Sequence, residues 1–165
     1  MADALRRTLL ALGDLDLDDM LKVLYLQSCG NLMSFAPLKQ LPLESVGLMD
    51  LPGIQDLDVL NELNLLSTLR LGPAEVTGLA SKGIRLENIH HVSLTGDASA
   101  ARLGSAVTAF PRTVSLRVLS GTELDLAPLA AHPTLRRVTT PPNCRLLKAD
   151  RLPDTIALNP DRRTM

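Results

Sequence analysis

The residue types that carry chemistry are sparse in this chain, and their arrangement does not suit catalysis. His90 and His91 are adjacent, and because successive strand residues point to opposite faces, their imidazoles cannot bind one metal ion together. Cys29 and Cys144 lack a Cys-x-x-Cys partner and a cysteine or histidine cluster, which argues against zinc. We therefore expect no catalytic residues, no cofactor and no metal, and a protein that is not an enzyme.

Two short segments resemble ligand-binding loops without completing them. Residues 14–19 carry carboxylates at alternate positions, as calcium-binding EF-hand loops do, but the glycine and the final acid of such a loop are replaced by Asp19 and Tyr25. We interpret this segment as a solvated acidic edge. The segment from Gly78 to Gly83 lacks the spacing of a phosphate-binding loop, so no phosphate site is predicted there.

The dominant pattern is a pair of residues two positions apart, nearly all apolar, that recurs along the chain. The pairs are Leu24/Leu26, Val46/Leu48, Leu69/Leu71, Val92/Leu94, Leu116/Val118, Val138/Thr140 and Ile156/Leu158. The first five intervals are 22 to 24 residues, and the last is 18. A step of two is typical of a strand, whereas the steps of three between pairs are typical of tightly turning 3-10 backbone. Each unit is therefore expected to contain one strand and one returning segment.

One returning segment differs from the others. Leu103, Val107 and Phe110 are spaced as on one face of a helix, which predicts an α-helix from Ala98 to Phe110. The other returning segments are expected to be 3-10 or irregular. The sequence therefore predicts an α/β fold, namely a right-handed solenoid with one parallel sheet of six or seven short strands on its concave side.

Three parts of the chain are distinguished on this basis. Residues 1–20 are expected to form an N-terminal capping segment, residues 21–158 the solenoid, and residues 159–165 a flexible tail. Hydrophobic residues make up 45% of the chain and aromatic residues only 2%, which favours stacked aliphatic side chains over an aromatic core.

Charge and hydropathy narrow the expected partners and the compartment. The net charge of −1 gives no basic footprint for nucleic acid, and no apolar run is long enough to predict a membrane-spanning helix. The N-terminus lacks the pattern of a signal peptide, and two distant cysteines do not form a disulfide framework. We therefore expect a cytoplasmic protein that binds neither nucleic acid nor membrane.

A family resemblance adds to this interpretation. Residues 125–138 are similar to the DLSPLAxLxxLRxL returning segment of bacterial leucine-rich repeats of the short class of about 22 residues, and residues 35–46 run the same way. The chain thus resembles a leucine-rich-repeat protein over residues 21–158. Such arrays often form the C-terminal recognition region of bacterial NACHT-type NTPases, the ATPases of antiphage defence. The resemblance implies a non-catalytic recognition module, the sensor region of such an NTPase.

Two classes of function stay open. The first is protein recognition, either as the sensor end of a larger switch protein or as a free-standing adaptor. The second is a structural or autoinhibitory role, in which the solenoid docks on an enzymatic domain. A surface made of stacked strands is shallow, and it suits binding better than enclosing a small substrate.

The expected binding surface is the outward face of the strands. If the recurring pairs point inward, the residues between them and flanking them on both sides point outward. Interfaces draw their binding energy mainly from aromatic and arginine residues. We therefore predict partner contacts, with histidine included for its exposed position, at Tyr25, Arg70, His91, Arg117 and Arg137. The arginines predict a protein partner with an acidic patch, or a neighbouring domain of the same polypeptide.

Overall fold

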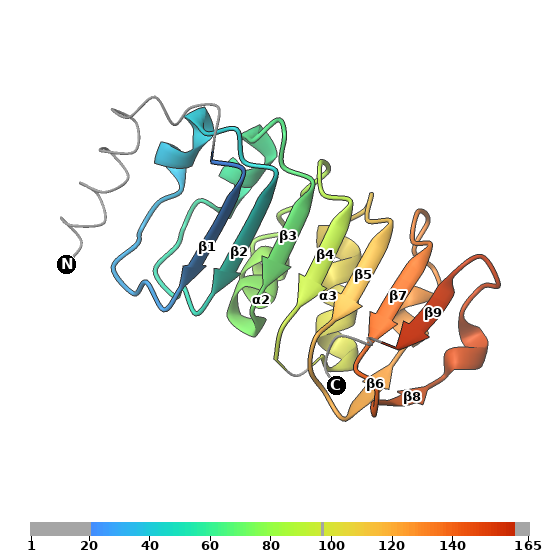
Figure 1. Ribbon diagram of the computed structural model, residues 1–165. Coiled ribbons are helices and arrows are strands. Elements are labelled where there is room, and N and C mark those ends of the chain that lie inside the picture. The colour runs from blue at the N-terminus through green and yellow to red at the C-terminus, as the bar shows by residue number, and fades with distance from the viewer. Residues whose placement is uncertain (1–20, 97, 161–165) are drawn as a thin grey trace.

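The computed structural model describes residues 21–96 and 98–160, and within them seven parallel strands form one sheet (Figure 1). The sheet order follows the chain order, β1-β2-β3-β4-β5-β7-β9. These strands are β1 (Val23–Gln27), β2 (Ser45–Met49), β3 (Thr68–Leu71), β4 (His91–Leu94), β5 (Ser115–Val118), β7 (Arg137–Thr140) and β9 (Ala157–Pro160). The protein thus has an α/β fold with a parallel sheet. The capping segment expected at residues 1–20 lies outside the described residues, and β9 includes the first two residues of the expected tail, 159–165.

The pairing register follows the recurring apolar pairs. Leu69 pairs with Val46 on one side and with Val92 on the other, and the same phase continues across the sheet. The seventh pair was wrong, because Leu158 and not Ile156 pairs with Val138. Ile156 is buried immediately before β9, in a turn closed by the hydrogen bond from its N–H to the Pro153 carbonyl, so its burial mimics that of a strand residue in the sequence pattern.

The core is a stack of aliphatic side chains contributed by successive strands. The inward residues of the middle strands are at most 1% exposed; they are Val46, Leu48, Leu69, Leu71, Val92 and Leu94. Because neighbouring strands lie about 4.8 Å apart, each of these side chains contacts its counterparts in the strands before and after it. The spacing of the sequence pairs therefore becomes one continuous apolar layer.

The returning segments complete the core on one side of the sheet. They contain the 3-10 helices η1 (Ala36–Gln40), η2 (Leu57–Glu62), η3 (Ala127–Leu129) and η4 (Ala149–Arg151), and the α-helices α2 (Pro73–Ser81) and α3 (Ala100–Ala109). Figure 1 shows α2 and α3 behind the sheet, while the strands face the viewer. The expected helix near residues 98–110 is present as α3, and its first turn is capped by the Ser99 hydroxyl, which accepts from the Arg102 N–H.

Two features of the returning segments were not predicted. α2 is an α-helix where a 3-10 or irregular segment was expected, and it begins with a proline directly after Gly72, a position where proline favours a helix start. The second feature is a two-stranded parallel sheet of β6 (Glu123–Asp125) and β8 (Arg145–Leu147), so the single sheet of the sequence prediction is incomplete. Each of these strands has three residues, too few for a clear alternating pattern.

The aliphatic stack predicts a large difference between two leucines that are close in sequence. Leu69 is fully buried in β3, whereas Leu65 is 57% exposed before the same strand. Leu69→Ala should lower the free energy of unfolding by about 2–5 kcal/mol, because it removes buried contacts and leaves a cavity. Leu65→Ala, the matched control, should change it by about 0.5 kcal/mol or less. Urea unfolding followed by circular dichroism measures both, and equal midpoints would contradict the stack.

An ion pair spans the small second sheet in addition to the backbone pairing of its two strands. The Asp125 Oδ2 atom lies 2.5 Å from Lys148 Nζ, and Oδ1 accepts from the Ala127 N–H at 3.0 Å. The hydrogen bond from Lys148, followed by that from Ala127, lowers the pKa of the Asp125 carboxyl below its ordinary value. The carboxylate form of Asp125 therefore joins the end of β6 to the residue after β8 and to the start of η3.

This ion pair predicts a specific acid dependence of stability. Because the pKa of Asp125 is lower in the folded protein, its contribution is complete above the ordinary carboxyl pKa of about 3.9 and is lost as the pH falls through the folded value. Asp125→Asn should therefore flatten the loss of stability with acid, and Lys148→Met should flatten it similarly. Urea midpoints measured from pH 6 to pH 2 test this, and curves parallel to that of the unmodified protein would refute it.

Candidate functional site

The side of the sheet opposite the helices presents columns of outward residues, and two of these columns together we call the open face. A further column, which starts with the paired residues Gln27 and Met49, lies beyond the central one. The central column contains the residues between the inward pairs, Tyr25, Gly47, Arg70, Ser93, Arg117, Thr139 and Asn159. The entry column lies beside it and contains Val23, Ser45, Thr68, His91, Ser115, Arg137 and Ala157. All five predicted contact residues thus lie in these columns, with Tyr25, Arg70 and Arg117 in the central one.

The charges of the open face have one sign. Its charged side chains are Arg70, Arg117 and Arg137, and neither column contains an aspartate or a glutamate. The chain as a whole carries a net charge of −1, so the positive side chains are concentrated on this face relative to the whole. An excess of one sign over a surface attracts partners of the opposite sign and disfavours those of the same sign.

Tyr25 and Gly47 form the apolar end of the central column. The Tyr25 side chain is 57% exposed, and its ring covers Gly47 on the neighbouring strand, which is itself buried. A methyl group in place of the Gly47 hydrogen would lie only 2.6 Å from the ring atom Cε1. The ring therefore lies flat against β2 because position 47 has no side chain, and its outer face is available to a partner.

The basic residues differ in how they are held. Arg70 and Arg117 are half-buried, whereas His91 and Arg137 are exposed. The Arg70 Nε–H is inaccessible to solvent and has no acceptor among the described residues. Arg117 takes part in an interaction within the protein.

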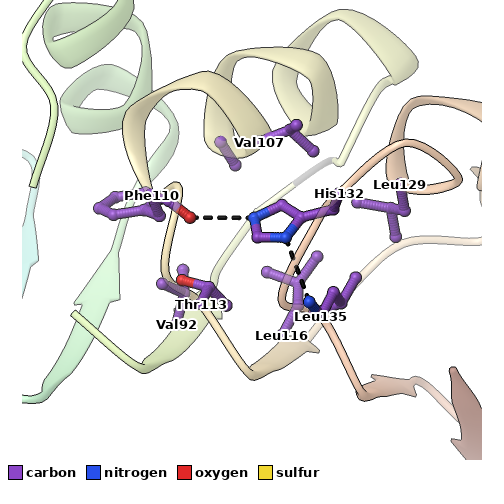
Figure 2. Close-up of a pocket in the computed structure, with 9 residues that line it drawn as sticks. Val92, Val107, Phe110, Thr113, Leu116, Leu129, His132 and Leu135 are labelled. Atoms are coloured by element: carbon purple, nitrogen blue, oxygen red, sulfur yellow. Dashed lines mark hydrogen bonds between the residues drawn. The ribbon is translucent and has the colours of Figure 1, made fainter. Parts of the chain in front are cut away.

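A second candidate, the apolar pocket around His132, is filled by the protein itself. Figure 2 shows the imidazole between α3 and the segment before β7, with dashed lines to Phe110 and Leu135. The ring Nδ1 accepts from the Leu135 N–H at 3.2 Å, so Nε2 carries the hydrogen and donates to the Phe110 carbonyl at 2.9 Å. The remaining cavity is about 10 Å³, which leaves room for one water at most. His132 therefore joins two successive units.

A third candidate is a cavity of about 290 Å³ between α2 and the segment after β2. Its polar side chains already serve the fold. Glu75 is 4% exposed, and its Oε1 accepts from the Leu51 N–H at 2.8 Å, while Lys82 donates to the Gln55 carbonyl at 2.7 Å. Both side chains hold the turn that follows Asp50, a residue with a positive φ of 56°. The other carboxylate oxygen of Glu75, Oε2, is buried and has no hydrogen-bond partner among the described residues.

The remaining residues singled out by chemistry are dispersed. His90 and His91 are exposed, and Cys29 donates to the Gln27 carbonyl. Burial raises the pKa of the Cys144 thiol, which favours its protonated and less reactive form. Among residues 21–96 and 98–160, no three histidine, cysteine, aspartate or glutamate side chains are grouped as metal ligands.

Comparisons with known proteins give no match: no protein-family model, no curated protein and no solved structure matches the chain. In the part of the chain that the structure describes, no helix has the length and apolar character needed to cross a membrane.

The sequence predicted the outward position of Tyr25 and the arginines, but not the structural roles of Gly47 and His132. In the sequence, the role of Gly47 is indicated by its position in the second unit, which is equivalent to that of Tyr25 in the first unit. The role of His132 is indicated by its position among apolar residues shortly before a strand begins. Both roles depend on which residues become neighbours across strands.

The contact between Tyr25 and Gly47 yields a direct test. In Gly47→Ala, the added methyl group and the tyrosine ring cannot occupy the same space, so the ring must leave β2. We expect a changed emission and a lower fluorescence anisotropy of Tyr25, the single tyrosine in a chain without tryptophan. Ser45→Ala on the same strand is the control and should leave both signals unchanged. Unaltered tyrosine fluorescence in Gly47→Ala would show that the ring does not lie there.

Proposed function

We propose that this chain is a leucine-rich-repeat solenoid that recognises a protein through its open face. The observation that carries the proposal is the register of seven parallel strands, in which the apolar pairs are buried on one side and the central column is presented on the other. A crossover between parallel neighbours is right-handed in about 98% of cases, which supports a right-handed solenoid. A shallow sheet surface suits a macromolecular partner better than a small substrate.

The composition of the open face supports recognition over a purely structural role. An exposed tyrosine and three arginines are the residue types that dominate binding energy at interfaces. The small residue between the two central arginines, Ser93, lets a partner backbone approach the sheet. In this proposal the module is non-catalytic and cytoplasmic, and its resemblance to the repeat region of NACHT-type NTPases makes it the sensor of such a protein or a free-standing adaptor.

The second candidate function is docking on a neighbouring domain of the same polypeptide. The open face would serve this role with the same residues, because internal domain interfaces resemble transient protein interfaces. What separates the two functions is whether the contact is made by another chain or by the same one.

Site-specific crosslinking tests the proposal. A photoreactive benzoylphenylalanine is introduced at Ser93, in the middle of the open face, or at Asp58, which is exposed on η2. After irradiation in native cells we expect an adduct from position 93 and none from position 58, with the partner identified by mass spectrometry. An adduct within the same polypeptide would select the docking alternative.

The partner is then purified and its affinity measured. Ser93→Trp should abolish binding, because a bulky side chain fills the space between Arg70 and Arg117, and it should leave the melting temperature unchanged. Asp58→Lys is the control on the helix side and should bind normally. Binding that survives Ser93→Trp but is lost in Asp58→Lys would place the interface on the helix side and contradict the proposal.

A further inference from the structure

We propose that the cavity between α2 and the segment after β2 binds a small aliphatic amine in its ammonium form, with the Glu75 carboxylate as the counter-charge. This site lies on the helix side of the sheet and is separate from the open face, so it goes beyond the proposed function. It is indicated by a buried acid that the described part of the chain leaves incompletely paired.

Glu75 lies in the first turn of α2 and lacks a full set of partners. Its side chain is 4% exposed, and its Oε1 atom accepts from the Leu51 N–H at 2.8 Å. Its Oε2 atom is buried without a hydrogen-bond partner, and no basic side chain of the described residues forms an ion pair with it. Acids are almost never fully buried unless they are paired. A cation in the adjoining cavity would complete the pairing of this one.

The walls of the cavity indicate the rest of the ligand. Its interior is lined by the buried side chains of Leu51, Ile54 and Leu57, each at most 8% exposed. The lining residues that are exposed, and so form the mouth, are Pro52, Gln55, Ala74 and Lys82. A volume of about 290 Å³ is close to the lower limit of about 300 Å³ for ligand pockets, which suits a ligand of few atoms. An acid beside aliphatic walls therefore favours an ammonium group on a short aliphatic chain.

The second carboxylate oxygen needs only a small movement to reach the cavity. Oε2 is closed off where it packs over Gly72, since a methyl group at that position would lie 2.6 Å from it. The terminal torsion of a glutamate side chain is broad, so a rotation about it turns Oε2 toward the cavity while the carboxylate stays beside the Leu51 N–H. An ammonium group has three N–H donors and forms a charge-assisted hydrogen bond with this oxygen.

The basic residue in the lining, Lys82, does not take the place of this cation. Its Nζ atom donates to the Gln55 carbonyl at 2.7 Å and to the Ile54 carbonyl at 3.5 Å. Positions 75 and 82 are seven residues apart, which corresponds to about 10 Å along a helix axis. Water screens the charge of the exposed lysine at the mouth, whereas the charge of the buried Glu75 acts on the interior with little screening. The interior therefore favours a cation over an anion.

Gly78 leaves space for the ligand. It lies within α2 (Pro73–Ser81), where glycine is less favourable than alanine. A methyl group at this position would lie 3.5 Å from the Leu57 Cδ1 atom, an ordinary contact between two residues that line the cavity. A leucine at position 78 would therefore extend into the cavity and fill it. Gly104 in α3 is a matched control, because a methyl group there would meet nothing within 4 Å.

The test compares two small probes of the same shape. Isopentylamine is an ammonium ion at neutral pH, and isopentyl alcohol is its uncharged analogue. Binding is followed by nuclear magnetic resonance of backbone amides, above all that of Leu51, which donates to the Glu75 carboxylate. We expect saturable shifts at Leu51 and Gly78, with an affinity for the amine at least about tenfold higher than for the alcohol, because the charge-assisted contact is the stronger one.

Protein variants complete the test. Glu75→Gln keeps an oxygen for the Leu51 N–H but removes the charge, so it should weaken binding of the amine at least about tenfold and leave that of the alcohol unchanged. Gly78→Leu should abolish binding of both probes, and Gly104→Leu should leave both unchanged. Circular dichroism verifies the fold of each variant. Because Gly78→Leu leaves the carboxylate intact, it tests the site even if Glu75→Gln is unstable.

Four outcomes would overturn the inference. They are the absence of a saturable shift at Leu51, equal affinity for the two probes, unchanged affinity for the amine in Gly78→Leu, and the same shifts with potassium chloride as with the amine. None of them depends on crosslinking at position 93, so this site and the proposed function are tested separately.

Discussion

The structure depends on one physical constraint, the requirement that each unit bury its aliphatic pair against the pairs of its neighbours. A single strand such as β3 cannot hide Leu69 and Leu71 alone, and it does so only between β2 and β4. The recurrence of the pairs follows from this constraint, and the returning segments absorb the differences in spacing without a change of register. The scarcity of aromatic residues follows too, since a layer between strands about 4.8 Å apart is filled by aliphatic side chains.

The same constraint separates the two sides of the sheet. Buried pairs fix which residues face inward, so their alternating neighbours must face outward whatever their type. The outward residues are therefore not constrained by the core, and here they include an exposed tyrosine and three arginines. His132 and Glu75 show the complementary case, in which polar side chains on the other side are used to join successive units.

The sequence was sufficient to predict the first six strands of the large sheet, their order and their outward residues, because a period of two within a longer period specifies both strand and register. It was insufficient where a local signal is short or depends on a neighbouring unit. α2 begins with a proline after a strand, and its helical spacing over Val76 and Leu79 is too brief to distinguish from a turn. Similarly, β6 and β8 become strands through pairing with each other, and Gly47 has its role because Tyr25 lies beside it.

The central claim is that successive units form one parallel sheet in register, with the pairs inward and the central column outward. Nuclear Overhauser effects between backbone protons of neighbouring strands test it most directly. The account predicts contacts from Leu69 to both Val46 and Val92 with the pattern of parallel strands. It also predicts no contact between the side chains of Leu69 and Arg70, because these two side chains lie on opposite faces of the sheet. An antiparallel pattern, or the absence of contacts between these three residues, would contradict it.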